Sequence, residues 1–136
     1  MEPGFEVKTA QLGPETFVVS VTGEADLHTA PEIEQELREV LRLGGRAAAL
    51  DLVEVGFIDS TTLSLLLRFQ PRFRARGGDL VIVSDDRRVL RTLEITGMDR
   101  IFRTERRLGD ALAAMLADGV SANGTAVAAQ SAPEPA

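Results

Sequence analysis

The chain lacks cysteine altogether and has a single histidine, His28, among its 136 residues. Without cysteine, neither a disulfide nor a thiolate metal site can form, and a reducing compartment is compatible with the composition. The N-terminus has no basic region followed by an apolar run, so we expect no secretory signal. The longest apolar-rich stretch, residues 63–69, is far shorter than the roughly 20 residues that a membrane-spanning helix needs. We therefore expect a cytoplasmic protein with no membrane partner.

Glycine-rich phosphate loops are also absent, because the chain contains neither a Walker pattern nor Gly-x-Gly-x-x-Gly. The formal net charge of −6 argues against nucleic acid as a direct partner. The charge is uneven: residues 24–39 carry six acids against the lone Arg38, whereas residues 68–76 carry four arginines and no acid. An acidic and a basic surface on one small domain favour recognition of another protein, although each run is equally compatible with a solvated helix face.

The hydrophobic pattern predicts alternating strands and helices in a single domain. Strands are expected at residues 5–12, 16–22, 47–52, 80–83 and 101–102. Helices are expected from Thr29 to the Gly44-Gly45 stop, from Asp59 to the Gly77-Gly78 stop, over residues 87–96 and over residues 108–116. The order β-β-α-β-α-β-α-β-α predicts an α/β fold in which helices cover a mixed sheet. We expect this domain to span residues 1–116 and a disordered tail to occupy residues 117–136.

The first helix begins with a capping-box pattern. Thr29 and Glu32 stand three residues apart, so each side chain is expected to accept a bond from the other's free backbone N–H.

The start of the second helix carries the most suggestive polar side chains. Asp59, Ser60, Thr61 and Thr62 all favour positions at a helix N-terminus, where unpaired N–H groups and a partial positive charge attract anions. A hydroxyl there can be a cap, a nucleophile or an acceptor of a phosphoryl group. From the local pattern alone, an N-capping Ser60 is the favoured interpretation, because serine is a preferred cap.

Two other kinds of site are compatible with part of the sequence. A serine hydrolase would need Ser60 with His28 and either Asp26 or Asp59, but the Gly-x-Ser-x-Gly elbow is missing and lone loop histidines are usually solvated. A cation site would need acids gathered at strand ends, and isolated acids at such junctions are more often caps; the candidates are Asp26, Asp51, Asp59, Asp85 and Asp86.

Residues 51–63 resemble the signature of STAS domains, specifically of bacterial anti-sigma factor antagonists. That family typically has hydrophobic-Asp-Ser-Ser/Thr-Gly-Leu where this chain has Ile58-Asp59-Ser60-Thr61-Thr62-Leu63. Residues 23–30 resemble a second family landmark, the Gly-Glu-x-Asp-x-x-Thr-Ala turn before the first helix. The resemblance covers about residues 5–116.

The resemblance implies a regulatory binding module rather than an enzyme, with no cofactor. By correspondence, Ser60 is the serine that a partner anti-sigma factor phosphorylates, this partner being a serine kinase of the histidine-kinase-like ATPase type. Asp26 and Asp59 match acids beside it, and the implied partner-binding residues are Asp26, Asp59, Thr61, Thr62 and Ser64. The unphosphorylated domain would bind the anti-sigma factor and release a sigma factor for transcription; phosphorylation would block binding, and a phosphatase would reset it.

Thr62 departs from the family pattern, which usually has glycine there. Two alternatives therefore stay open: Thr61 or Thr62 shares the acceptor role, or the domain is a STAS scaffold that binds a partner without phosphorylation. A third alternative does not depend on Thr62: a small serine hydrolase or nucleotide-binding domain that uses Ser60 or Asp26.

Overall fold

In the computed structural model, which describes residues 5–125 and 127–128, five strands form one sheet in the order β1-β2-β3-β4-β5. The elements, in chain order, are β1 (Glu6–Gln11), β2 (Thr16–Ala25), α1 (Ala30–Arg42), β3 (Ala47–Ile58), α2 (Ser60–Arg74), β4 (Asp79–Val83), α3 (Arg87–Thr96), the short 3₁₀ helix η1 (Met98–Arg100), β5 (Thr104–Glu105), α4 (Leu108–Asn123), β6 (Gly124–Thr125) and β7 (Val127–Ala128). This succession through α4 confirms the predicted α/β order.

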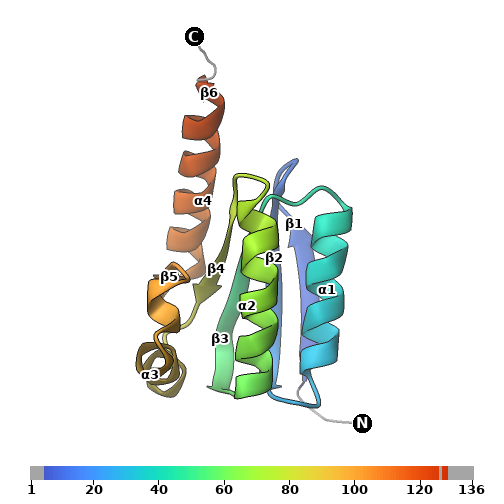
Figure 1. Ribbon diagram of the computed structural model, residues 1–136, viewed down its shortest axis with the longest axis vertical. Helices are drawn as coiled ribbons and strands as arrows, with labels where there is room; N and C mark the ends of the chain where they lie inside the picture. The colour runs from blue at the N-terminus through green and yellow to red at the C-terminus, as the bar shows by residue number, and fades with distance from the viewer. Residues whose placement is uncertain (1–4, 126, 129–136) are drawn as a thin grey trace.

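The sheet is mixed, as predicted. β1 and β2 form an antiparallel hairpin, while β2, β3, β4 and β5 pair in parallel. The parallel pairs require crossover connections, and α1, α2 and α3 supply them. The carboxyl ends of β2, β3 and β4 therefore lie at one end of the molecule, where Figure 1 shows α1 and α2 beginning.

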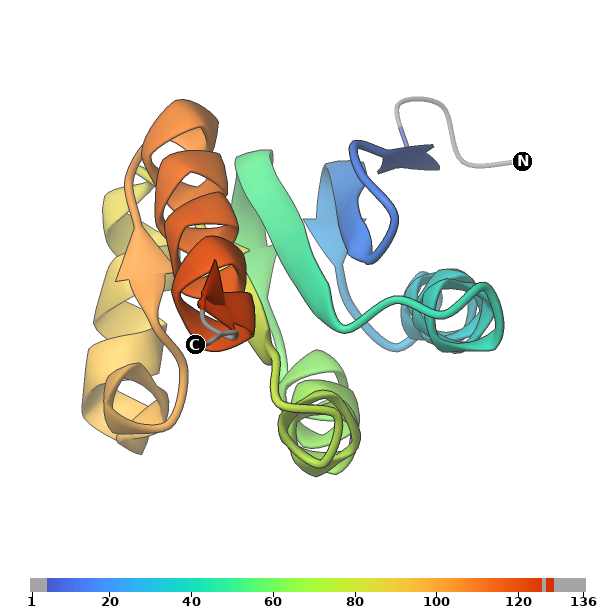
Figure 2. The same cartoon turned by 90° about the horizontal axis from the view of Figure 1, so that it is seen from above.

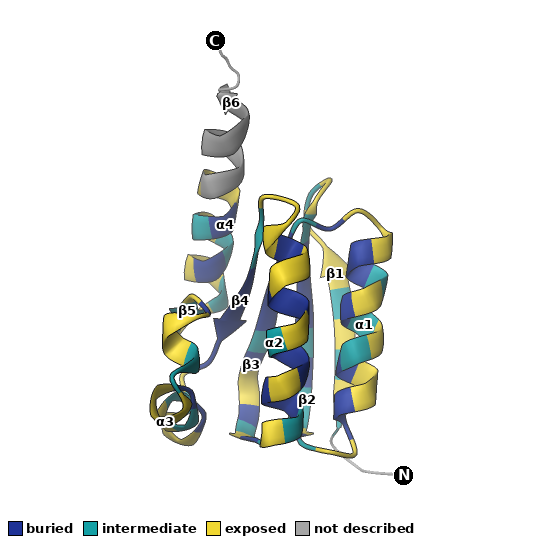
Figure 3. Cartoon of the chain, viewed as in Figure 1, coloured by how far each residue is buried: buried dark blue, intermediate teal, exposed yellow. Residues whose placement is uncertain are grey.

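The sheet lies between two layers of helix (Figure 2). Alternate residues of β2 point to opposite faces, so Phe17, Val19 and Val21 enter the main core with α1, α2 and α3, whereas Val18 joins a smaller cluster under α4. The inner faces of α1 and α2 are correspondingly buried along their length (Figure 3). None of the described helices is long and apolar enough to cross a membrane.

Four predicted boundaries are wrong. β3, expected to end at Leu52, continues to Ile58, because its pairing with β2 extends that far. β2 continues past Gly23 to Ala25, because Gly23 itself pairs with Val55 of β3 and, after a register shift in which β3 has the extra residue, Ala25 pairs with Ile58. The expected strand at Ile101-Phe102 is absent: these residues follow η1, Phe102 is buried in the main core, and β5 forms later, at Thr104–Glu105. The apolar side chains of Ile101 and Phe102 indicated that this segment packs on the core, but they did not indicate its backbone conformation.

The fourth wrong boundary is the end of α4. The helix ends at Asn123 and not at Leu116, so the lack of large apolar residues after Leu116 did not mark its end. Residue 117, where the tail was expected to begin, thus lies inside α4. Residues 126 and 129–136 of that expected tail lie outside the described residues.

Candidate functional site

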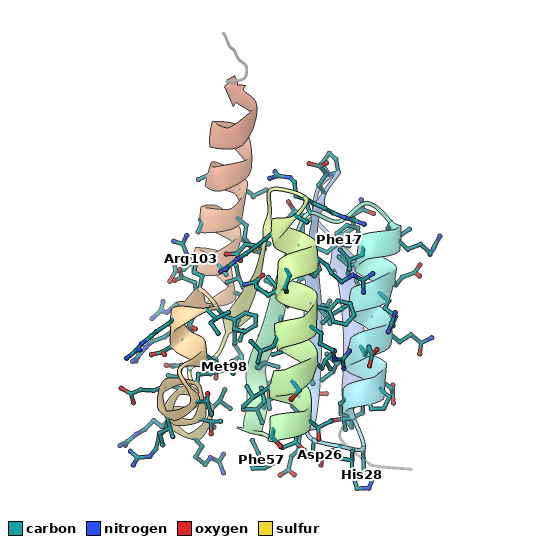
Figure 4. All side chains as sticks on the ribbon, in the orientation of Figure 1. Phe17, Asp26, His28, Phe57, Met98 and Arg103 are labelled. Carbon is teal, nitrogen blue, oxygen red and sulfur yellow. The ribbon has the colours of Figure 1, made fainter. Side chains whose placement is uncertain are left out.

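The ends of β2 and β3 bring two loops together at one end of the sheet. Ala25 pairs with Ile58, and the Asp59 backbone N–H donates to the Ala25 carbonyl at 3.0 Å. The loop after β2 begins at Asp26 and the turn after β3 begins at Asp59, so both leave this pairing together. Figure 4 shows Asp26, His28 and Phe57 at this end, with Phe57 by the first turn of α2 and His28 below the start of α1. The two sequence landmarks, 33 positions apart in the chain, therefore form one surface.

Asp59, and not Ser60, caps α2. Its side chain accepts a hydrogen bond from the Thr62 backbone N–H at 2.9 Å, and its backbone is extended, as an N-cap residue requires. Ser60 is the first helical residue and is exposed. Its hydroxyl makes no hydrogen bond with any other described residue. The capping interpretation of Ser60 is therefore wrong, and the hydroxyl is open to an incoming group.

Asp26 organises the loop before α1. Its Oδ1 accepts from the backbone N–H groups of His28 at 2.9 Å and Thr29 at 3.3 Å. Thr29 Oγ1 in turn accepts from the Asp26 N–H at 2.8 Å and donates to the Glu24 carbonyl at 2.7 Å. The predicted capping box does not form, because these loop bonds occupy the Thr29 hydroxyl, and Thr29 makes no side-chain bond to the helix.

The hydroxyls that follow Ser60 differ in accessibility. Ser64, one turn further along α2, is exposed, and Thr61 is half-buried. Thr62 is fully buried, and its Oγ1 has no hydrogen-bond partner among the described residues. Thr62 therefore belongs to the interior and cannot contact a partner or accept a phosphoryl group in this conformation, contrary to the expectation from sequence.

Two exposed apolar side chains at this end of the sheet are not among the predicted site residues. Leu27 in the loop after β2 is 63% exposed, and Phe57 near the end of β3 is 49% exposed. Each is next to a landmark acid, Asp26 or Ile58-Asp59, and this adjacency was the available signal. Apolar side chains exposed beside a polar rim are typical of protein-binding surfaces.

Two arginines of the basic run at residues 68–76 contact α1 or the residues just after it. Arg68 lies 3.7 Å from Glu34 of α1, and Arg76 donates to the carbonyls of Leu41 and Gly45 at 2.8 and 2.9 Å. A hydrogen bond from Arg38, with the nearby charge of Arg68, lowers the pKa of the Glu34 carboxyl. Part of the basic run therefore fastens α2 to α1 and is not a free binding surface.

The described residues give Ser60 no hydrogen-bonded base. His28 is 89% exposed at its side chain, and its Nδ1 lies 3.9 Å from Asp26 Oδ1. The candidate cation ligands do not gather either, since no group of three or more His, Cys, Asp or Glu in the described part of the chain is placed to hold a metal. Asp59 and Asp86 are instead helix caps, and Asp51 binds the Ser20 hydroxyl at 3.3 Å.

The chain is a small α/β domain with a mixed sheet, and both sequence landmarks of the STAS resemblance lie at one end of that sheet. The family model of the STAS domain matches residues 8–111, and the chain belongs to this family.

Its relatives are regulatory proteins. The anti-sigma-B factor antagonist of Listeria monocytogenes is 32% identical over 92 residues, which are 68% of this chain and 81% of that protein. The anti-sigma-B factor antagonist of Staphylococcus aureus is 33% identical over 82 residues, or 60% of this chain and 76% of that protein. The crystal structure of an anti-sigma factor antagonist from Mycobacterium paratuberculosis superposes with a TM-score of 0.75 at 30% identity, covering 84% of this chain and 97% of that one.

Proposed function

We propose that this chain is an anti-sigma factor antagonist that is switched by phosphorylation of Ser60. Unphosphorylated, it binds an anti-sigma factor and thereby releases a sigma factor; phosphorylated, it no longer binds. The partner is a serine kinase of the histidine-kinase-like ATPase type, and a phosphatase restores the binding form. The names of the relatives support the partner class, and the exposed, unbonded hydroxyl of Ser60 supports the acceptor.

The binding surface is the end of the sheet around Ser60. Its apolar centre is formed by Leu27 and Phe57, and its polar rim by Asp26, Asp59, Thr61 and Ser64. Exposed apolar side chains with polar neighbours supply the desolvated centre and wet rim of an interface.

Phosphorylation at Ser60 would act through charge. A phosphoserine adds about −1.5 to −2 charges, and the free N–H groups at the start of α2 would stabilise it. The same charge would stand at the interface beside Asp26, Asp59 and the exposed Glu24. A loss of about 3–4 kcal/mol in binding corresponds to a change in affinity of roughly two to three orders of magnitude.

The test uses Ser60→Ala and Ser60→Asp with the cognate anti-sigma factor and radiolabelled ATP. Ser60→Ala should bind like the wild type and take up no label, whereas Ser60→Asp should bind at least about 100-fold more weakly. Thr61→Val and Ser64→Ala are the matched controls and should still be labelled, because each removes a neighbouring hydroxyl. Label in Ser60→Ala would show that the acceptor is another residue.

If the wild-type protein binds the anti-sigma factor but takes up no label, the phosphorylation switch is contradicted. The remaining interpretation is then a STAS scaffold that binds its partner without phosphorylation. Turnover of ester or nucleotide substrates by the isolated chain would contradict the regulatory role, and we expect none because Ser60 has no hydrogen-bonded base in the described residues.

A further inference from the structure

A pocket lined by arginines lies between α3 and β5. It has a volume of about 620 Å³, and four arginines line it: Arg87, Arg88, Arg91 and Arg106. Leu90, Leu93 and Thr104 contribute less polar surface, and two acids, Glu94 and Asp99, also border it. The volume is within the range of small-molecule sites. The pocket therefore combines a concave shape with several guanidinium groups on its lining.

Two of these arginines are occupied by neighbouring acids. Arg88 Nη2 lies 3.1 Å from Asp86 Oδ2, and Arg106 Nη1 lies 3.6 Å from Asp85 Oδ1. The Arg88 guanidinium also lies against Gly56, where an added Cβ would fall 2.3 Å from Nη2. Its hydrogen bond to Asp86 lowers the pKa of that carboxyl, so the pair stays ionised. Arg88 and Arg106 are thus partly neutralised by acids at the edge of the pocket.

The other two arginines have no such partner. Arg87 and Arg91 make no hydrogen bond or ion pair with any described residue, although Glu94 stands three positions after Arg91 on the same helix. They are four residues apart on α3, where two like charges destabilise a helix by about 0.2–0.5 kcal/mol. Arg87 is also the first residue of α3, where the helix dipole disfavours positive charge. Stability alone gives no reason for two unpaired arginines here.

The surrounding segment is basic within an acidic protein. Residues 85–107 carry seven arginines and five acids, a net charge of +2, whereas the whole chain has a net charge of −6. Guanidinium groups bind phosphate and carboxylate oxygens through two parallel hydrogen bonds. Two unpaired guanidiniums one turn apart over a concave surface are suited to a ligand with two such anionic groups.

We propose that the pocket between α3 and β5 binds a small oxyanion with at least two negative charges, held by Arg87 and Arg91. Phosphates and carboxylates share this chemistry. The proposal does not depend on the role of Ser60.

The test is calorimetric titration of the full chain with pyrophosphate, ADP and succinate at low ionic strength. Pyrophosphate should bind the wild type, and the double variant Arg87→Gln/Arg91→Gln should bind it at least about tenfold more weakly. The matched control is Arg100→Gln/Arg107→Gln, which removes the same charge from two exposed arginines just outside the pocket and should bind like the wild type. Thermal unfolding of both double variants verifies that they are folded.

The comparison of ligands identifies the chemical class. Tighter binding of pyrophosphate than of succinate supports the proposal and assigns the site to phosphates, and the reverse order supports it and assigns the site to carboxylates. If ADP binds more tightly than pyrophosphate, the proposal is supported and the pocket also contacts the nucleoside part of the ligand. Absence of binding by all three, or equal weakening in both double variants, would overturn the proposal, the second result because it indicates a general effect of charge.

Discussion

At the scale of single residues, two threonines next to the site have opposite hydrogen-bonding states. Thr29 is buried and its hydroxyl makes bonds to Asp26 and Glu24, whereas Thr62 is buried and its hydroxyl has no partner among the described residues. An unpaired buried hydroxyl costs about 1–3 kcal/mol. Thr62 therefore occupies the family's glycine position at an energetic cost.

Replacing each threonine with valine, which has nearly the same shape, tests this contrast. Thr62→Val should raise the free energy of unfolding by about 1 kcal/mol, because it removes an unsatisfied hydroxyl. Thr29→Val should lower it by about 1–2 kcal/mol, since it leaves the Glu24 carbonyl and the Asp26 N–H unpaired. Urea unfolding measures both values. A destabilised Thr62→Val protein would indicate that the Thr62 hydroxyl does have a partner.

At the scale of elements, the turn from α2 to β4 depends on two adjacent glycines for different reasons. Gly77 has φ +80°, which other residues adopt with strain, and an added Cβ would contact nothing within 4 Å. A Cβ at Gly78 would fall 1.7 Å from the Arg46 carbonyl oxygen, which is backbone leading into β3. Gly77 allows a left-handed backbone conformation, and Gly78 allows the backbone entering β4 to lie close to the backbone entering β3.

Alanine at the two positions should therefore have unequal effects. Gly77→Ala should cost about 1–2 kcal/mol, the usual cost of a left-handed residue. Gly78→Ala should cost at least about 2 kcal/mol more, because backbone must move to relieve the overlap. Thermal or urea unfolding of the pair measures the difference. Equal costs would indicate that the Gly78 contact relaxes without moving β3.

The helix ends could be predicted from the sequence in part, and the accessibility of the site residues could not. Capping side chains and glycine stops are local, so the bounds of α3, including the end before Gly97, could be predicted. Which of Asp59 and Ser60 caps α2 could not, because both are good caps and the backbone decides between them. The burial of Thr62 and the exposure of Phe57 depend on how α2 lies on the sheet, and no local pattern contains that packing.

At the scale of the whole molecule, the sheet's two faces are covered unequally. The main core under α1 and α2 contains large side chains, including Phe17, Leu50 and Phe69. The cluster under α4 is formed mostly by alanine and valine of the sheet, with Ala111 and Met115 as the buried residues of α4. Because less apolar surface fixes α4, its local opening should require less free energy than opening of the main core.

Amide hydrogen exchange of the full chain tests this inequality. The amides of residues 112–117 should exchange at least about tenfold faster than those of α1, which corresponds to about 1.4 kcal/mol of opening free energy. Met115→Ala should accelerate exchange in α4 and leave α1 unchanged, since it weakens only the smaller cluster. Leu37→Ala, in the main core, should accelerate both. Equal protection of α4 and α1 in the wild type would contradict the prediction, because it would mean that the two helix layers unfold together.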